Sequence, residues 1–299
     1  MNPITTRPKH IFLLVTLLVP LLAFGLTEPI LTQNPGTQHR TMQSGQQKRE
    51  YLLHIPQGYQ KDQKELLALV IMLHGRSSNG QRAASRYYGW TELADKEKFI
   101  AAFPTALGSP TSWKGAWPGQ PTQDSQFLSE LIDLLLQQLP IDQNQVFMTG
   151  HSSGGFMSFS FAVTHSNQVA AIAPVAGLLI GTRRPVLPIS VISFHGMADA
   201  IVPYGKEGSW GRGVLTAQES AKFFAQYNGC NGPVRSDINQ DKVHIDTWSH
   251  GKSSTQVQLY SIENGNHGWP RESYHSVAAT QIIWQFFKAH PRQSSTKDR

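Results

Sequence analysis

The sequence predicts an α/β fold in which a mostly parallel central sheet is covered by helices on both faces. Short apolar runs at residues 66–73, 99–103 and 257–262 have the composition of strands that are buried on both faces of such a sheet. Residues 124–139 instead repeat apolar side chains at three- and four-residue spacing, as an amphipathic helix does. Because strands and helices alternate from residue 66 onward, the strands are expected to run parallel.

The other elements follow the same alternation. Strands are also expected at residues 49–55, 146–148, 170–175 and 189–195, and helices at residues 80–98, 216–227 and 277–287. A loop over residues 105–123 has no periodicity, and loops of this length are usually functional or disordered.

The N-terminus predicts export. Arg7 and Lys9 precede an apolar run at residues 11–24, and Ala23 and Gly25 supply small residues at the −3 and −1 positions of a cleavage site. This is the layout of a signal peptide, which we expect at residues 1–25. The run is shorter than the ~20 residues that span a membrane, so no stable membrane insertion is expected after cleavage, although an uncleaved anchor remains an alternative. The mature protein is expected to be secreted or periplasmic.

The rest of the chain is expected to form a single domain. Residues 26–48 are polar and without periodicity and predict a flexible leader. No shift in composition divides residues 49–290, which predict one α/β domain, and residues 291–299 predict a C-terminal tail.

Composition excludes several classes of function. A net charge of +6, from 26 basic and 20 acidic residues, is too small and too scattered to indicate a nucleic-acid partner. No spacing of cysteine and histidine is typical of a metal site, and no cofactor is implied. The single cysteine, Cys230, cannot form an internal disulfide.

The most informative stretch is Gly150-His151-Ser152-Ser153-Gly154. It follows a short strand and opens a helix, which is the context that a G-x-S-x-G nucleophile elbow requires. Ser152 is therefore the candidate nucleophile. The backbone N–H of Ser153, at the helix N-terminus, is a candidate oxyanion donor.

Partners for this serine follow later strands. Asp199 comes just after the strand at residues 189–195, and His267 lies in a glycine-flanked loop after the strand at residues 257–262. The order Ser152, Asp199, His267 is that of the α/β-hydrolase fold. The loop after the strand at residues 66–73 supplies the second oxyanion N–H in that fold, and Arg76 is the candidate. For His74, His151 and His195 we expect packing or hydrogen-bonding roles.

The candidate substrate-binding residues are tryptophans. Trp113 and Trp117 lie in the loop at residues 105–123, and Trp269 follows His267. Indole rings stack on aromatic acyl groups or on sugar rings, so these residues are expected to form a binding wall. Packing of the loop on the core is the alternative.

Several segments resemble the secreted poly(3-hydroxybutyrate) depolymerase family and its feruloyl and acetylxylan esterase relatives. They include GHSSGG, HGMADAIVPY and NHGWP, in register from about residue 49 to residue 290. The resemblance implies that Ser152 is the nucleophile, His267 the general base and Asp199 the group that orients it. The sequence departs from the family where the usual cysteine partner of Cys230 is missing near residues 248–251, and where only Asp124 remains of an acidic pair.

The predicted function is therefore a secreted serine carboxylesterase that forms an acyl-enzyme on Ser152. Its expected substrates are small or polymeric esters: feruloyl or acetyl esters of polysaccharides, or hydroxybutyrate oligomers. Two alternatives remain open, a serine peptidase of the same fold and a non-catalytic exported protein that binds carbohydrate.

Overall fold

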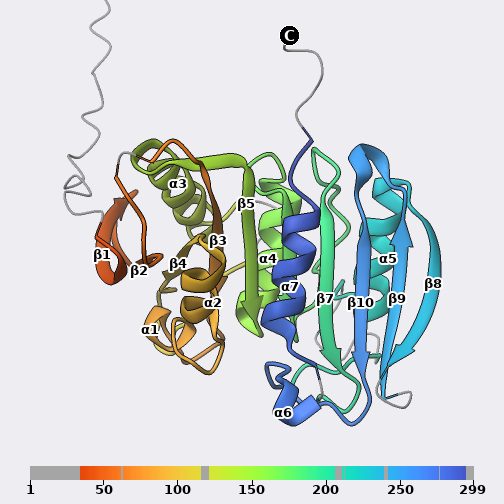
Figure 1. Cartoon of the computed structure of the whole chain (residues 1–299). Coiled ribbons are helices and arrows are strands. Elements are labelled where there is room, and N and C mark those ends of the chain that lie inside the picture. Colours follow the sequence, from red (N-terminus) through yellow and green to blue (C-terminus); the bar gives the residue numbers. More distant parts are fainter. Residues whose placement is uncertain are drawn as a thin grey trace, which may run out of the picture.

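The computed structural model describes residues 34–61, 63–115, 121–205, 211, 213–238, 242–275 and 277–293. Within them the strands are β1 (Gly36–Ser44), β2 (Gln47–Ile55), β3 (Leu67–Leu73), β4 (Ile100–Pro104), β5 (Ile141–His151), β6 (Ala171–Val175), β7 (Ser190–Gly196), β8 (Asn231–Ile238), β9 (Val243–Ser249) and β10 (Val257–Ile262). They form one sheet in the order β1-β2-β4-β3-β5-β6-β7-β10-β9-β8 (Figure 1).

The centre of this sheet is parallel and its two ends are antiparallel. The pairs β4–β3, β3–β5, β5–β6, β6–β7 and β7–β10 run parallel. Hairpins extend the sheet at both ends, where β1 pairs with β2 and β8 pairs with β9. The predicted α/β fold with a mostly parallel central sheet is confirmed.

Helices cover both faces of the sheet. They are α1 (Gly80–Ala83), α2 (Trp90–Glu97), α3 (Gln123–Gln138), α4 (Ser153–Thr164), α5 (Ala217–Asn228), α6 (Glu272–His275) and α7 (Ala279–Ala289), and a 3-10 turn spans Lys252–Ser254. Buried side chains of α3, α4 and α5 join one apolar layer. Those of α2 and α7 join a second layer, and both helices lie in front of the sheet in Figure 1.

Local signals explain where several helices begin and end. Thr122 and Thr216 each accept a hydrogen bond from the N–H three residues on, which closes a capping box at the start of α3 and of α5. The predicted helix at residues 80–98 divides into α1 and α2 because Gly89 between them has a φ of 72°, in the left-handed region that a helix interior excludes.

The expectation of a flexible leader at residues 26–48 is wrong for its second half. Residues Gly36–Ser44 form β1, which pairs with β2 along its whole length, and β2 begins at Gln47. Most side chains of β1 are exposed or half-buried and only Met42 and Ser44 are buried. The covered face of this edge strand carries only one apolar side chain, Met42, so the strand shows no apolar alternation and its pattern resembled a linker.

The expected tail at residues 291–299 also begins too early. The Arg292 backbone N–H donates to the carbonyl of Asn144, and its guanidinium donates to the carbonyls of Ser166 and Val169 at 2.6 Å each. The packed domain therefore extends past residue 290. The predicted signal peptide at residues 1–25 lies outside the described residues.

Within the described part of the chain, no helix is both long enough and apolar enough to cross a membrane.

Candidate active site

Ser152 stands at a sharp turn between β5 and α4. Its backbone has φ 56° and ψ −118°, and its N–H donates to the carbonyl of Val175 on the adjacent strand at 2.9 Å. A positive φ is uncommon for a residue with a side chain and marks strain that the surrounding structure must hold. This is the geometry that a nucleophile elbow requires, because it projects the side chain away from the sheet.

The glycines around Ser152 are required by close backbone approach. A Cβ on Gly150 would lie 2.4 Å from the carbonyl carbon of Gly154, and one on Gly154 would lie 2.3 Å from the carbonyl oxygen of Leu73. No side chain fits at these distances. The turn therefore packs directly on the end of β3, which places the loop after β3 beside Ser152.

Ser152, His267 and Asp199 come together as predicted. The Oγ of Ser152 lies 2.8 Å from Nε2 of His267, and Nδ1 of His267 lies 2.7 Å from Oδ2 of Asp199. With the proton on Nδ1, the imidazole donates to the carboxylate, and Nε2 is free to accept the hydroxyl proton of Ser152. The arrangement has the connectivity of a Ser-His-Asp triad.

The Asp199 carboxylate is held in place by its neighbours. Its other oxygen, Oδ1, accepts the backbone N–H groups of Ile201 and Val202 at 2.9 and 2.8 Å. Burial by itself would raise the pKa of Asp199, but the hydrogen bonds from His267, Val202 and Ile201 outweigh it and hold the pKa below its ordinary value. Asp199 therefore stays ionised and oriented toward the imidazole.

Two loops bring Asp199 and His267 together. They follow β7 and β10, which are parallel neighbours, so both loops leave the sheet at the same edge. A Cβ on Gly196 would lie 2.2 Å from the carbonyl oxygen of Gly265, and the Ala198 N–H donates to that oxygen at 3.0 Å. The two loops are thus packed backbone against backbone.

The candidate oxyanion donors lie beside Ser152. Ser153 is the first residue of α4, and a Cβ on Gly75, next to Arg76, would lie 3.5 Å from the Cβ of Ser152. Neither the N–H of Arg76 nor that of Ser153 has an acceptor among the described residues. Unpaired N–H groups in this position are what an oxyanion requires, so the assignment of both residues stays a prediction that this placement supports.

The expectation of a tryptophan wall is corrected for two of its three members. The side chain of Trp113 is buried and its Nε1 donates to the carbonyl of His74 at 3.0 Å. Trp269 is only 2% exposed, and its Nε1 donates to Oγ1 of Thr280 at 3.0 Å. Indoles that are buried and hydrogen-bonded in this way stabilise the loops around the site and offer no face to a polymer. Trp117 lies outside the described residues.

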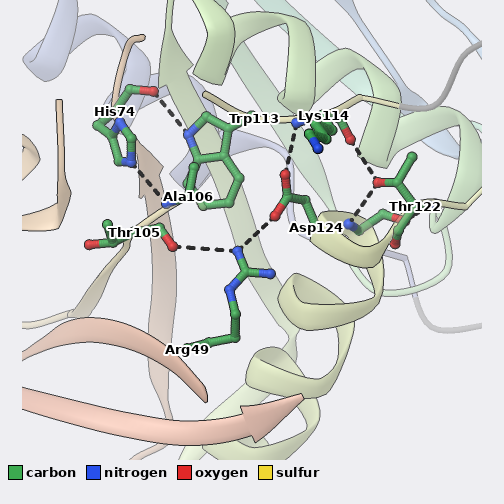
Figure 2. A network of polar contacts seen from close by, with 9 residues as sticks. Arg49, His74, Thr105, Ala106, Trp113, Lys114, Thr122 and Asp124 are labelled. Carbon is green, nitrogen blue, oxygen red and sulfur yellow. Dashed lines mark hydrogen bonds and ion pairs between the residues drawn. The ribbon is translucent and has the colours of Figure 1, made fainter. Parts of the chain in front are cut away.

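Figure 2 shows how the long loop before α3 is fixed. Arg49 of β2 forms a buried ion pair of 2.7 Å with Asp124, whose other oxygen accepts the N–H of Lys114 at 2.8 Å. Nε2 of His74 accepts the N–H of Ala106 at 3.0 Å. Asp124, the retained member of the acidic pair, therefore ties the loop to the sheet.

His151 was expected to have a structural role, and the structure gives it a specific one. Its Nε2 lies 3.2 Å from the backbone carbonyl of His267, and its Nδ1 lies 3.2 Å from the hydroxyl of Tyr88. Since a carbonyl only accepts, Nε2 carries the proton and Nδ1 accepts from Tyr88. Burial lowers the pKa of His151 to about 4, which keeps the ring neutral.

This support for the His267 loop could not be predicted. His151 was visible in the motif, but its partner Tyr88 is distant in the sequence and nothing in the pattern pairs them. Tyr88 is in turn held by Oγ1 of Thr280, which donates to its carbonyl at 2.6 Å.

Two cavities open near this edge of the sheet. One of about 560 Å³ includes His267 in its wall. A larger groove of about 1110 Å³ lies between the β1–β2 hairpin and the loops at residues 77–81 and 105–111, and no triad residue lines it. Among the described residues, no group of three or more His, Cys, Asp or Glu side chains is arranged to hold a metal ion.

Comparison with known proteins agrees with this geometry. Residues 121–229 match the family described as Phospholipase/Carboxylesterase. The chain is 26% identical over 268 residues to the probable feruloyl esterase C of Aspergillus terreus, covering 88% of this chain and 93% of that protein. It is 28% identical to the feruloyl esterase C of Emericella nidulans, covering 91% and 98%.

A solved structure has the same fold. The acetyl xylan esterase from Aspergillus awamori superposes with a TM-score of 0.61 at 14% identity, covering 84% of this chain and 99% of that one. The resemblance to feruloyl esterases is thus confirmed, and the resemblance to polyester depolymerases stays a prediction. The chain is similar to feruloyl esterases, has the α/β-hydrolase fold and is a carboxylic ester hydrolase.

Proposed function

We propose that the protein is an exported serine esterase that hydrolyses feruloyl or acetyl esters of polysaccharides through Ser152, His267 and Asp199. The observation that carries this proposal is the 2.8 Å contact between Ser152 Oγ and His267 Nε2 at a strained elbow. The feruloyl esterase relatives support the choice of acyl group, and the apolar run at residues 11–24 supports export.

The first half of the reaction forms an acyl-enzyme. Oγ of Ser152 attacks the ester carbonyl while its proton passes to Nε2 of His267, and Asp199 stabilises the imidazolium through Nδ1. The oxygen of the tetrahedral intermediate accepts the N–H groups of Ser153 and Arg76. The bond to the alcohol then breaks, and the alcohol oxygen takes the proton from Nε2.

The second half releases the acid. Water attacks the acyl carbon and gives a proton to Nε2, and the bond to Oγ breaks as Ser152 recovers that proton. Both alcohol and acid leave, and the enzyme returns to its starting state with no added cofactor.

Initial rates on matched esters test the proposal. Methyl ferulate, p-nitrophenyl acetate and a 3-hydroxybutyrate oligomer are compared for the protein beginning at residue 26, with Ser152→Ala as the blank. Preference for ferulate or acetate supports the polysaccharide esters, whereas preference for the oligomer favours a polyester substrate. Absence of Ser152-dependent turnover on all three contradicts the proposal.

A further inference from the structure

One peptide unit, Gly75–Arg76, carries a candidate oxyanion donor, the N–H of Arg76. A peptide unit is planar and almost always trans, so its carbonyl oxygen and its N–H point in opposite directions within one rigid plane. A side chain that holds the Gly75 carbonyl therefore also decides where the Arg76 N–H points.

His74 holds this carbonyl. Its Nδ1 lies 2.6 Å from the Gly75 carbonyl oxygen, and its Nε2 lies 3.0 Å from the backbone nitrogen of Ala106. Because a carbonyl only accepts and a backbone N–H only donates, Nδ1 carries the proton and Nε2 accepts. The ring is fully buried, and burial lowers the pKa of His74. His74 is therefore a neutral imidazole in a single tautomer, with both nitrogens in use.

The long loop before α3 fixes this imidazole (Figure 2). Ala106 binds Nε2 of the ring, and the indole Nε1 of Trp113 donates to the His74 carbonyl at 3.0 Å, with the two ring centroids 5.3 Å apart. The loop is in turn tied to the sheet by the buried ion pair of Arg49 and Asp124. The ring is thus held in one orientation.

The peptide unit also lies directly against the nucleophile. A Cβ built on Gly75 would lie 3.5 Å from the Cβ of Ser152 and 3.5 Å from the carbonyl oxygen of His151. At this range, a rotation of the Gly75–Arg76 peptide turns the Arg76 N–H away from the oxygen of a tetrahedral intermediate on Ser152. The rate of the reaction is therefore sensitive to how this peptide is held.

The hydrogen bond from His74 acts on the donor in two ways. It fixes the plane of the peptide, and it polarises the peptide so that its N–H donates more strongly. We propose that His74 is a positioning residue that aims the Arg76 N–H into the oxyanion hole through the bond from its Nδ1 to the Gly75 carbonyl. The inference rests on the proposed function, in which an oxyanion forms on the ester carbonyl.

A buried histidine pairs its nitrogens in any case, so the experiment separates its two hydrogen bonds. The amide nitrogen of asparagine reaches about the position of Nδ1, and the amide oxygen of glutamine reaches about that of Nε2. His74→Asn therefore keeps the donor to Gly75 and loses the acceptor for Ala106, whereas His74→Gln does the reverse. Each variant leaves one buried backbone group unpaired, so both should unfold at a lower temperature than wild type.

Of these two variants, only His74→Gln should slow the reaction. On p-nitrophenyl acetate its kcat is expected to fall about 10- to 100-fold with little change in KM, because a misaimed donor weakens binding of the transition state and not of the substrate. His74→Asn should keep most of the wild-type kcat, although it is also less stable.

Inhibition by phenylboronic acid gives a second readout. Boron accepts an electron pair from Oγ of Ser152, whose proton passes to Nε2 of His267, and an oxygen of the tetrahedral adduct takes the oxyanion position. The inhibition constant should rise in His74→Gln by about the factor by which kcat/KM falls. It should stay near the wild-type value in His74→Asn.

His54 of β2 provides the matched control. It is also buried, with Nδ1 2.8 Å from the hydroxyl of Thr37 and Nε2 3.1 Å from Oδ1 of Asp95. Neither partner belongs to residues 74–76. His54→Gln should therefore unfold at a lower temperature than wild type but keep its kcat and its inhibition constant.

Nitrogen-15 NMR of the wild-type protein tests the tautomer without any variant. Near neutral pH, Nδ1 of His74 should carry a proton and Nε2 should carry none. A proton on Nε2 would overturn the proposal whether or not the variants fold.

Two results with the variants would overturn the inference and leave the proposed esterase standing. One is a wild-type kcat and inhibition constant in His74→Gln, and the other is an equal loss of rate in His74→Gln and His74→Asn. Absence of turnover by the wild-type protein would instead overturn the proposed function, and this inference with it.

Discussion

Ser152 could be assigned from the sequence because its surroundings are local. The elbow needs a strand, two glycines and a helix within a few residues, and all of them are contiguous at residues 145–160. Asp199 and His267 could be assigned because each follows a strand, and parallel strands end at one edge of a sheet. The prediction was wrong for Trp113 and Trp269 because their burial depends on tertiary contacts with His74 and Thr280, which no local pattern reveals.

His151 is predicted to position His267 through its backbone. His151→Leu removes the donor to the His267 carbonyl, so the imidazole should lose its alignment with Ser152 and kcat should fall about 10- to 100-fold with little change in KM. His151→Gln offers both a donor and an acceptor and should restore most of the rate. Equal loss in both variants, or a loss confined to KM, would contradict a positioning role.

The neutral state of His151 also predicts a pH dependence of stability. Its pKa is about 4 in the folded protein against 6.5 ordinarily, so between these values the unfolded chain binds the proton and the folded chain does not. The stabilisation is complete above pH 6.5 and is lost as pH falls toward 4, with a slope of up to ~1.4 kcal/mol per pH unit. Between pH 7 and pH 4, urea unfolding should show a larger loss of stability in wild type than in His151→Gln, which has no titrating group at this position; a constant offset between the two would contradict this.

At the scale of elements, the central strands and β2 were predictable, whereas β1, β8 and β9 were not. The side chains of β3 are all buried, so its composition is apolar throughout. Every residue of β8 is exposed, and the residues of β1 are exposed or half-buried except Met42 and Ser44. Strands at the ends of a sheet are specified by hydrogen bonds to a neighbouring strand, which leave little trace in hydrophobicity.

Cys230 directly precedes β8 and Gly251 closely follows β9, so this end hairpin allows a test of the disulfide that the chain lacks. A Cβ built on Gly251 would lie 2.6 Å from Sγ of Cys230 and 2.4 Å from Oγ1 of Thr255. In reduced form Gly251→Cys should be less stable than wild type because of crowding against Thr255. On oxidation it should form a bond to Cys230 and become more stable than its own reduced form by ~3 kcal/mol.

Thiol titration and thermal unfolding in the two redox states check the Gly251→Cys prediction. Gly251→Ala is the matched control, because it is crowded in the same way and cannot be rescued by oxidation. A reactive thiol that persists in oxidised Gly251→Cys would contradict the proximity of the two positions.

The buried ion pair between β2 and α3 should be costly to break from one side. Arg49 and Asp124 are 1% and 5% exposed at their side chains, and a single buried charge without its partner destabilises by ~3–5 kcal/mol. Asp124→Asn should therefore lower the free energy of unfolding by this order. The asparagine keeps an oxygen that accepts the N–H of Lys114. The loss of stability therefore measures the cost of leaving the buried charge of Arg49 without a partner.

The double variant Arg49→Met/Asp124→Asn is the control for this pair. With both charges removed, no buried charge is left uncompensated, and the double variant should be more stable than Asp124→Asn in urea unfolding. Equal or greater loss in the double variant would mean that the attraction between the two charges itself dominates.

At the scale of the whole molecule, the sheet order decides where the candidate catalytic residues lie. Strands β3, β5, β7 and β10 end at one edge, and the loops after them carry Arg76, Ser152, Asp199 and His267. This convergence follows from the alternation of strands and helices and was therefore predictable. The pocket beside His267 was not, because it depends on how three separate segments, around Tyr87, Ile201 and His267, lie against one another.

The central claim is that Ser152 carries the acyl group during turnover. Acid quenching of wild-type protein during hydrolysis of p-nitrophenyl acetate, followed by peptide mass spectrometry, should find one acetyl group on the peptide that contains Ser152. Asp199→Asn should slow its formation, and Ser152→Ala should show none while unfolding at the wild-type temperature. An acetyl group on another residue, or undiminished turnover by Ser152→Ala, would contradict the account.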